Sequence, residues 1–173
     1  KAPIAISHLN YSAVSGAYCL YFNKNLAASY ELGDLYGLAL DGKWTFDKFH
    51  EMVKDLYIDD GNDKKDENDF YGMTQNQGTA LNSYLWAFDN PIVAKDEEGV
   101  PQVAVKTDKI DSIINSLYDF LYNTDGVFYD VDNYNEKTIA YNLFYSKRAI
   151  FMMGTVGSAV NEKLRNFDDD YGL

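Results

Sequence analysis

The sequence of 173 residues is poor in the side chains that carry thiol and metal chemistry. It contains one cysteine and two histidines. A single cysteine excludes an internal disulfide, and Cys19 stands in an apolar run, where we interpret it as a small buried hydrophobic residue. His8 and His50 have no cysteine or carboxylate neighbours at the spacing of zinc ligands, so the sequence predicts no zinc site. We expect His50 to lie on the solvated face of a helix.

Positive charge is scarce as well. The chain has 15 basic and 27 acidic residues, which gives a formal net charge of −12. Its longest basic run, Lys64-Lys65, is flanked by acidic residues. Nucleic acids and anionic membrane surfaces bind basic patches. We therefore expect no nucleic-acid partner and no binding to an anionic membrane surface.

Long apolar runs and the sequence patterns of several enzyme classes are missing too. No stretch has the length that a bilayer-spanning helix needs, and no signal peptide is present. The chain has neither a Gly-x-Gly-x-x-Gly pattern, nor a phosphate-binding loop, nor the Gly-x-Ser-x-Gly turn of many hydrolases. Carboxylates are plentiful, but nothing marks a catalytic pair. We therefore predict a protein that is not an enzyme and needs no cofactor.

The chain is rich in aromatic residues, which make up 16% of it and include 15 Tyr and 10 Phe. Tyrosine covers apolar surface while keeping a polar tip, so it suits hydrophobic cores, protein interfaces and sugar-binding clefts alike. Hydrophobic residues amount to 46% of the chain. This composition is typical of a globular domain with a core of its own.

Hydrophobic periodicity predicts a mixed order of strands and helices. Thr45 is a suitable N-cap for the clearest helix, and Trp44 can pack on Phe49 as a hydrophobic staple. A helix over Asp108–Tyr122 should turn Ile114 inward, and Ser158 should cap a last helix that runs through Arg165. The other predicted elements are extended chain over Ile4–Phe22 with its surest strand over Ala17–Phe22, strands over 71–73 and Ala149–Met153, a hairpin over 92–105, and helices over Leu26–Leu32, Thr79–Phe88 and Thr138–Tyr145.

This alternation indicates an α/β domain of mixed α+β character, with helices around a small mixed sheet. We find no internal repeat and no linker, so residues 1–173 are assigned to a single domain. The chain opens on Lys1 without a methionine, and at Leu173 an apolar strand is just starting. We interpret both ends as boundaries of a piece of a longer polypeptide and expect any export signal outside it.

Several segments follow one another in the order typical of one protein family. Residues 21–26 (Tyr-Phe-Asn-Lys-Asn-Leu) are similar to a strand that ends in Tyr-Asn-Lys before a helix. Residues 42–49 (Gly-Lys-Trp-Thr-Phe-Asp-Lys-Phe) resemble a turn and helix start that leads to Asp-Phe-Tyr-Gly at 69–72. Residues 144–152 resemble a Phe-x-x-Gly-Lys-Ala-Ala-Met run with Ser146 in place of glycine, and Asp-Tyr-Gly at 170–172 resembles the next strand. From about Ala17 to Leu173, the chain resembles the extracellular solute-binding proteins of ABC importers, most of which bind carbohydrates.

The resemblance implies a type II periplasmic-binding-protein-like fold, in which two lobes close on a solute like a hinged trap. The chain would be one lobe of C-terminal type, truncated at both ends. Its partners would be a small solute such as a sugar or oligosaccharide, the missing N-terminal lobe and the permease of an ABC transporter. The full-length form would be extracellular or periplasmic, with a lipoprotein anchor in the extracellular case.

Sugar recognition combines aromatic faces with planar polar groups. The resemblance places the solute against the segment after residue 72, the segment before Ile92 and the loop after the Phe151 strand. Trp86 points away from the apolar side of its helix, so it is either a stacking platform or part of an interface, whereas Val156 replaces a frequent aromatic residue. The candidate ligand-binding residues are Tyr11, Asn76, Gln77, Tyr84, Trp86, Thr155, Gly157 and Ser158.

The acidic loop over residues 59–69 admits two interpretations. One is a calcium site, because four oxygen-bearing side chains occur near the spacing of an EF-hand loop. The candidate ligands are Asp60, Asn62, Asp66 and Asp69. Asp63 stands where such a loop requires glycine, and Ile58 stands at the first ligand position. These departures favour the second interpretation, a solvated acidic loop.

Two further functions stay open at this stage. The chain would also suit a cell-surface interaction domain that reuses the fold without transport. A lipoprotein signal and neighbouring permease genes would separate a transport role from that alternative. A hydrolase domain is the third possibility, and it requires an ordered pair of carboxylates in a cleft.

Overall fold

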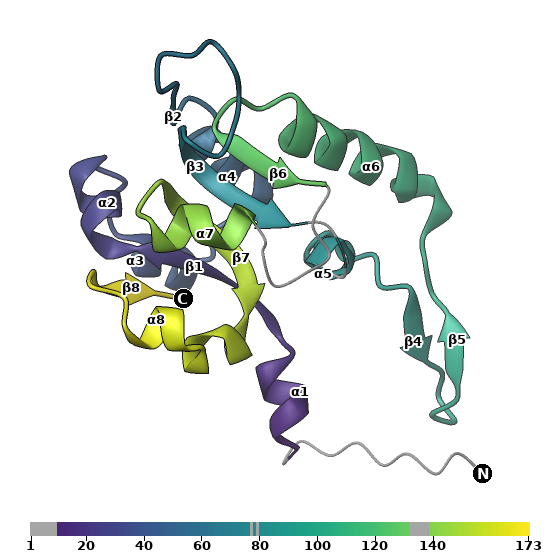
Figure 1. The fold of residues 1–173 in the computed structure, drawn as a ribbon. Coiled ribbons are helices and arrows are strands. Elements are labelled where there is room, and N and C mark those ends of the chain that lie inside the picture. The colour runs from purple at the N-terminus through teal and green to yellow at the C-terminus, as the bar shows by residue number, and fades with distance from the viewer. Residues whose placement is uncertain (1–9, 77, 79, 132–138) are drawn as a thin grey trace.

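A mixed β-sheet forms the centre of the computed structural model, which describes residues 10–76, 78, 80–131 and 139–173 (Figure 1). Within these residues the sheet has six strands. Its order is β2 (Tyr57–Ile58), β3 (Phe70–Asn76), β7 (Ala149–Thr155), β1 (Tyr18–Asn23) and β8 (Tyr171–Gly172), and β6 (Val127–Asp130) pairs with the second half of β3. Strands β3, β6 and β7 run parallel, whereas β1 runs antiparallel to β7.

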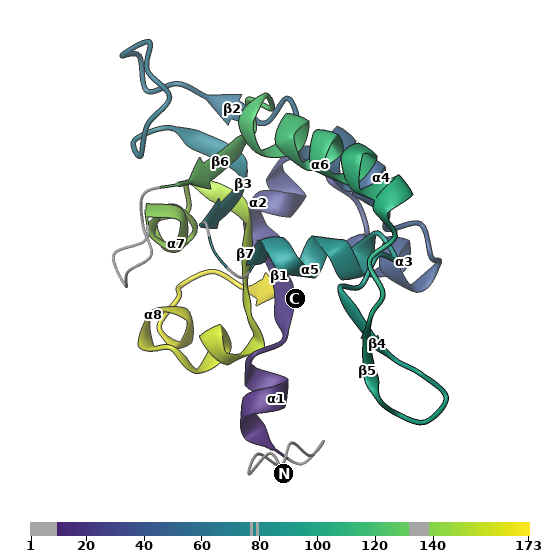
Figure 2. The same ribbon diagram turned by 90° about the vertical axis from the view of Figure 1, so that its right-hand side faces the viewer.

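Helices cover both faces of this sheet. Figure 2 shows α7 and α8 on one side of it and α4 and α6 on the other. The helices are α1 (Tyr11–Ser15), α2 (Lys24–Ser29), α3 (Leu35–Leu40), α4 (Phe46–Val53), α5 (Ala80–Ala87), α6 (Thr107–Tyr122), α7 (Ile139–Tyr145) and α8 (Glu162–Arg165), with a 3-10 turn η1 (Val156–Val160) before α8. A separate hairpin of β4 (Val93–Lys95) and β5 (Pro101–Val103) projects away from the sheet.

Side chains of the central strands pack into buried cores on both faces of the sheet, since side chains of a β-strand point to both faces. On the side of α4 and α6, the buried cluster includes Met73 and Phe151 from the sheet and Phe49 and Phe120 from these helices. On the side of α7 and α8, Tyr21 and Met152 pack with Phe144 and Leu164. The two cores fix the sheet between its helices, so the strand ends have defined positions.

The predicted fold class and most predicted elements are confirmed. The strand, hairpin and long-helix predictions agree with β1, β3, β7, the β4–β5 pair and α6 to within a few residues. Thr45 caps α4 as expected, because its side chain accepts a hydrogen bond from the Lys48 N–H at 3.1 Å. The Trp44 and Phe49 rings lie 5.6 Å apart between centroids, which confirms the hydrophobic staple.

Removing this cap gives a first testable prediction. Thr45→Ala should lower the free energy of unfolding by about 1 kcal/mol, because the Lys48 N–H then loses its acceptor. Chemical denaturation measures this loss. Thr45→Ser is the matched control, since it keeps the hydroxyl and should retain most of the stability. Equal losses in the two variants would contradict the role of the cap.

Two backbone predictions are wrong. Residues 11–15 were expected to be extended but form α1, because the Asn10 side chain accepts a hydrogen bond from the Ser12 N–H at 3.1 Å and starts a helix. Ser158 does not cap the last helix, since it lies inside η1. Asn161 caps α8 instead, by accepting from the Lys163 N–H at 3.0 Å. Helix α3 was not predicted at all, and it starts at the Asp34 cap.

Two burial predictions are wrong as well. Ile114 was placed in the core, but 55% of its surface is exposed on the outer side of α6. His50 was expected in solvent, yet it is half-buried. Its Nε2 lies 2.9 Å from Thr124 Oγ1, and its ring packs edge-on against Phe120. Periodicity within one helix cannot reveal that a neighbouring loop covers its polar face, and this is what happens at His50.

Candidate functional site

The parallel strands β3, β6 and β7 end at the same edge of the sheet, as the register of their pairing requires. Asn76 ends β3, Asp130 ends β6 and Thr155 ends β7. Tyr18 begins the antiparallel β1 and lies directly opposite Thr155. In open α/β sheets, ligands bind outside the carboxyl ends of parallel strands. This edge is therefore the candidate site.

Tyr21 fixes the backbone of the loop after β7 through its hydroxyl group. Its buried hydroxyl donates to the carbonyl oxygen of Thr155 at 2.9 Å and is 3.2 Å from that of Val156. Burial raises the pKa of Tyr21, so this hydroxyl remains a donor at neutral pH. In the same loop, Thr155 Oγ1 and Ser158 Oγ lie 3.5 Å apart. Two hydroxyls therefore stand together on a loop whose backbone is fixed.

Because Gly157 has no side chain, the end of α1 can approach this loop closely. A Cβ at this position would lie 2.9 Å from the carbonyl oxygen of Ser15, at the end of α1. The Val156 N–H also donates to the carbonyl oxygen of Ala17 at 2.8 Å. The loop with Thr155 and Ser158 is thus packed against α1, which carries Tyr11 with 68% of its surface exposed.

Helix α5 presents its two candidate aromatic residues in opposite ways. Trp86 is 64% exposed, whereas Tyr84 is 6% exposed. The Tyr84 hydroxyl donates to Gln75 Oε1 at 2.7 Å, which joins α5 to β3. Burial raises the pKa of Tyr84, so this donor also stays protonated. Trp86 therefore offers a ring to solvent, while the polar tip of Tyr84 is turned inward.

A pocket of about 600 Å³ lies between β1, α5 and the start of α4. Its walls are mostly apolar and include Leu20, Trp44, Phe46 and Phe88. Ligand pockets commonly have this volume and combine apolar walls with a few polar groups. Tyr18 and the Tyr84 ring also line it, so the pocket adjoins the carboxyl edge of the sheet.

The structure thus brings some sequence-predicted residues together and leaves others apart. Asn76 and Thr155 end neighbouring strands, and Gly157 and Ser158 follow in η1. Gln77 lies outside the described residues. Asp130 was not among the predicted residues; it is 4% exposed and accepts a hydrogen bond from the Ala140 N–H at 3.4 Å. The short apolar run Val127–Phe128 before it was the available signal for a strand ending there.

The acidic loop is organised around Asp69, which is 1% exposed. Its carboxylate accepts from the hydroxyls of Tyr57 at 2.9 Å and Tyr71 at 3.2 Å, and from the backbone N–H groups of Asp60 at 3.0 Å and Asp66 at 2.9 Å. Carboxylate oxygens of Asp59, Asp60 and Asp69 lie within 4.8 Å of one another.

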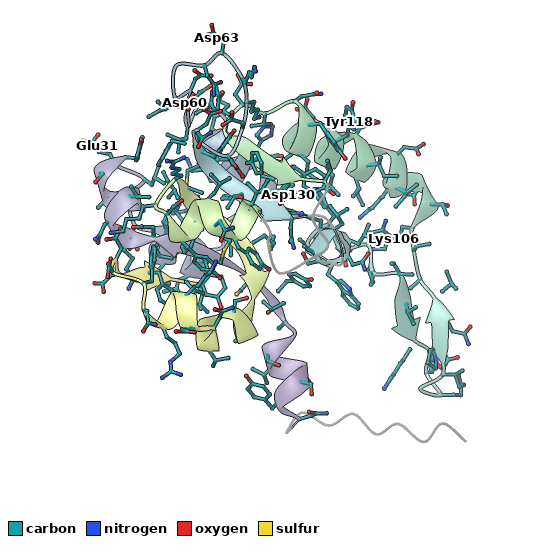
Figure 3. All side chains as sticks on the ribbon, viewed as in Figure 1. Glu31, Asp60, Asp63, Lys106, Tyr118 and Asp130 are labelled. Carbon is teal, nitrogen blue, oxygen red and sulfur yellow. The ribbon has the colours of Figure 1, made fainter. Side chains whose placement is uncertain are left out.

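Two other candidate calcium ligands of this loop bond to each other, since Asn62 Nδ2 donates to Asp66 Oδ2 at 3.0 Å. Figure 3 shows the loop with Asp60 and Asp63 beyond the end of the sheet. These hydrogen bonds hold the loop in its shape.

Comparison with solved structures identifies the fold. One match is a maltose/maltodextrin-binding domain from Bdellovibrio bacteriovorus bound to maltotriose, with a TM-score of 0.61 and 14% identity over 90% of this chain and 35% of that one. Another is the Thermus thermophilus maltotriose-binding protein bound with maltotriose, with a TM-score of 0.57 and 15% identity over 90% of this chain and 36% of that one. The chain has the fold of part of a periplasmic solute-binding protein. No protein-family model and no curated protein sequence matches it.

The likeness confirms the expected fold class and the fold that the family resemblance implied. Both neighbours are binding proteins rather than enzymes. The chain spans about 35% of the length of the first of them. Among the residues that the structure describes, no helix combines the length and the apolar character needed to cross a membrane.

Proposed function

We propose that the chain is the ligand-binding lobe of a solute-binding protein that delivers a carbohydrate to an ABC transporter. One observation carries the proposal: 90% of the chain shares its fold with each of two proteins that are bound to maltotriose. The polar groups at the carboxyl edge and the exposed ring of Trp86 supply the two kinds of contact that sugars need.

In this proposal the carboxyl edge forms one wall of the sugar cleft. The hydroxyls of Thr155 and Ser158 and the amide of Asn76 hydrogen-bond sugar hydroxyls, and Trp86 stacks on a sugar ring. The opposite wall belongs to a second lobe of the same polypeptide, and closure of the two lobes around the sugar is a population shift. The lobe alone makes only part of the contacts, so it binds weakly.

We also propose a protein partner and a cellular location. The complete protein docks on the permease of an ABC importer, and it works outside the cytoplasmic membrane, as a lipoprotein or in a periplasm. It performs no catalysis, uses no cofactor and binds no nucleic acid. The acidic net charge of −12 is consistent with the last point, because nucleic-acid binding needs basic patches.

A sugar titration of this chain tests the proposal. Millimolar maltotriose should shift the backbone NMR signals of Gly157 and Ser158, and Trp86→Ala should weaken binding by about tenfold, which corresponds to about 1.4 kcal/mol for one aromatic stacking contact. The isolated lobe is expected to bind in the millimolar range.

Leu40→Ala is the control for this experiment, because Leu40 is 89% exposed on α3. It should leave the affinity unchanged. The titration should include other oligosaccharides and a set of peptides at the same concentrations. Shifts at the carboxyl edge with peptides but with no sugar would reject the carbohydrate assignment.

A further inference from the structure

A continuous apolar trough crosses β1 on the side of α4. The pocket of about 600 Å³ beside α5 shares Leu20 and Trp44 with a second pocket of about 160 Å³, which lies between β1, α3 and β7. Both pockets are open to solvent in the part of the chain that the structure describes. We call them together the β1 trough, and its lining includes Leu20, Phe22, Trp44, Phe49, Phe151 and Met153.

The floor of the β1 trough is the main hydrophobic core itself. Phe49 lines the larger pocket, and Phe22 and Phe151 line the smaller one. All three belong to the buried cluster between the sheet and α4, whereas Leu20 and Trp44 pack on that cluster and remain half-buried. Protein interiors are closely packed, and a contiguous apolar surface that is left open marks an interaction site. The trough is therefore a docking surface that continues the core.

The lining of the trough favours an apolar polypeptide segment as the occupant. Among the described residues that line it, Asp47 alone carries a charge. Because the trough runs over both pockets and is open on one side, a small solute would leave much of it uncovered. An apolar stripe on a segment of chain can fill such a groove along its whole length. Two copies of this chain, each with a net charge of −12, repel one another.

The matched structures indicate the source of such a segment. Each of them shares its fold with 90% of this chain, but this chain covers only 35% of the first and 36% of the second. Most of the polypeptide of each neighbour thus lies outside the shared part. A segment that is tethered to the surface on which it docks has a high effective concentration there, so it needs no high affinity of its own.

We propose that a segment of the same polypeptide, outside residues 1–173, docks in the β1 trough and completes the main core. The proposal rests on the proposed function in one respect, namely that this chain is part of a longer solute-binding protein. Docking also supports the carboxyl edge of the sheet. Tyr84 lines the larger pocket, and its hydroxyl donates to Gln75, the neighbour of Asn76 at the end of β3. A segment packed against the Tyr84 ring therefore holds this hydrogen bond in place.

Hydroxyl-radical footprinting followed by mass spectrometry tests the proposal on individual side chains. The experiment compares this chain with the longer polypeptide encoded by the same gene, both without sugar. Modification of Trp44 and Met153 should fall to a small fraction in the longer polypeptide, because the docked segment excludes water from the trough. Tyr118 on α6 (Figure 3) is the internal control, since it is 57% exposed and should react equally in both proteins.

Leu20→Asn provides a second measurement. In this chain Leu20 is half-buried, so the substitution should lower the melting temperature moderately. In the longer polypeptide the amide would be buried against the docked segment, and the melting temperature should fall further than in this chain. Ile114→Asn is the matched control, because Ile114 is 55% exposed on α6. It should cause equally small shifts in both proteins. If Leu20→Asn does not fold, the footprint of the two wild-type proteins decides alone.

Equal modification of Trp44 in the two wild-type proteins would overturn the docked segment. Protection of Trp44 in this chain at high concentration, together with a dimer in gel filtration, would replace the segment with a second copy. Protection that appears only when 4-nitrophenyl maltoside is added would replace it with an apolar group of the solute. Protection of Trp44 in the longer polypeptide combined with a failed sugar titration would reject the carbohydrate assignment and retain the docked segment.

Discussion

Gly126→Ala should lower the free energy of unfolding by about 4 kcal/mol or more, a loss that only a few kinds of substitution produce. Gly126 immediately precedes β6 and lies against the end of α4. A Cβ at this position would stand 1.8 Å from the carbonyl oxygen of Val53. That oxygen belongs to the backbone, so it cannot move aside without displacing the helix end. Since domains of this size are stable by about 5–15 kcal/mol, this loss removes a large share of the total stability.

The comparison with Gly99→Ala separates this crowding from the conformational freedom of glycine. Gly99 has a φ of 78° in the β4–β5 turn, and a Cβ there would meet no atom within 4 Å. Its replacement should cost only about 1–2 kcal/mol of left-handed backbone strain. Chemical denaturation followed by circular dichroism measures both losses, and the soluble yield serves where Gly126→Ala does not fold. A loss at Gly126 no larger than that at Gly99 would show that α4 and β6 can separate freely.

Local sequence patterns were sufficient for elements whose determinants lie within a few residues. The Thr45 cap and the Trp44 staple depend on positions at most five residues apart, and both are present. The apolar run of β7 and the periodicity of α6 likewise gave correct elements. Helix α1 escaped notice because five residues are too few for a periodic pattern, and the Asn10 cap alone specifies its start.

Local patterns could not predict contacts between segments that are distant in the sequence. His50 bonds to Thr124, which is 74 residues away, and residue 126 must be glycine because Val53 at the end of α4 lies against it. In the candidate site, the resemblance indicated the loop of Thr155 and Ser158, and the register of β3 with β7 explains why Asn76 ends beside it. The pocket beside α5 was not predicted, because its walls come from four segments that lie together only in the folded sheet.

Asp69→Ala should lower the free energy of unfolding by about 3 kcal/mol or more, since hydrogen bonds to a buried charged group contribute about 1.5–3 kcal/mol each. The Asp69 carboxylate accepts four such bonds, and its removal leaves the hydroxyls of Tyr57 and Tyr71 without this acceptor. The loop has a second anchor, because Lys65 Nζ donates to the carbonyl oxygen of Thr124 at 3.0 Å. The loss of the carboxylate should loosen the acidic loop, and it should also weaken the neighbouring β2–β3 pair, since Tyr57 and Tyr71 belong to these strands.

The pH dependence of the free energy of unfolding shows whether the charge of Asp69 causes this stabilisation. Burial favours a higher pKa for this carboxyl, but the backbone N–H groups of Asp66 and Asp60 and the hydroxyls of Tyr57 and Tyr71 outweigh it and lower the pKa. Because the folded protein binds this proton less readily than the unfolded chain does, the stabilisation is complete above about pH 4 and is lost as the pH falls towards the lowered value.

Asp69→Asn keeps the shape of the side chain but cannot titrate, so it isolates this effect. The stability gap between the wild type and Asp69→Asn should be largest near about pH 7 and should shrink towards about pH 3. Denaturation curves at a series of pH values measure the gap, and the other carboxylates cancel in the comparison. A gap of constant size across that range would mean that the loop depends on the shape of Asp69 and not on its charge.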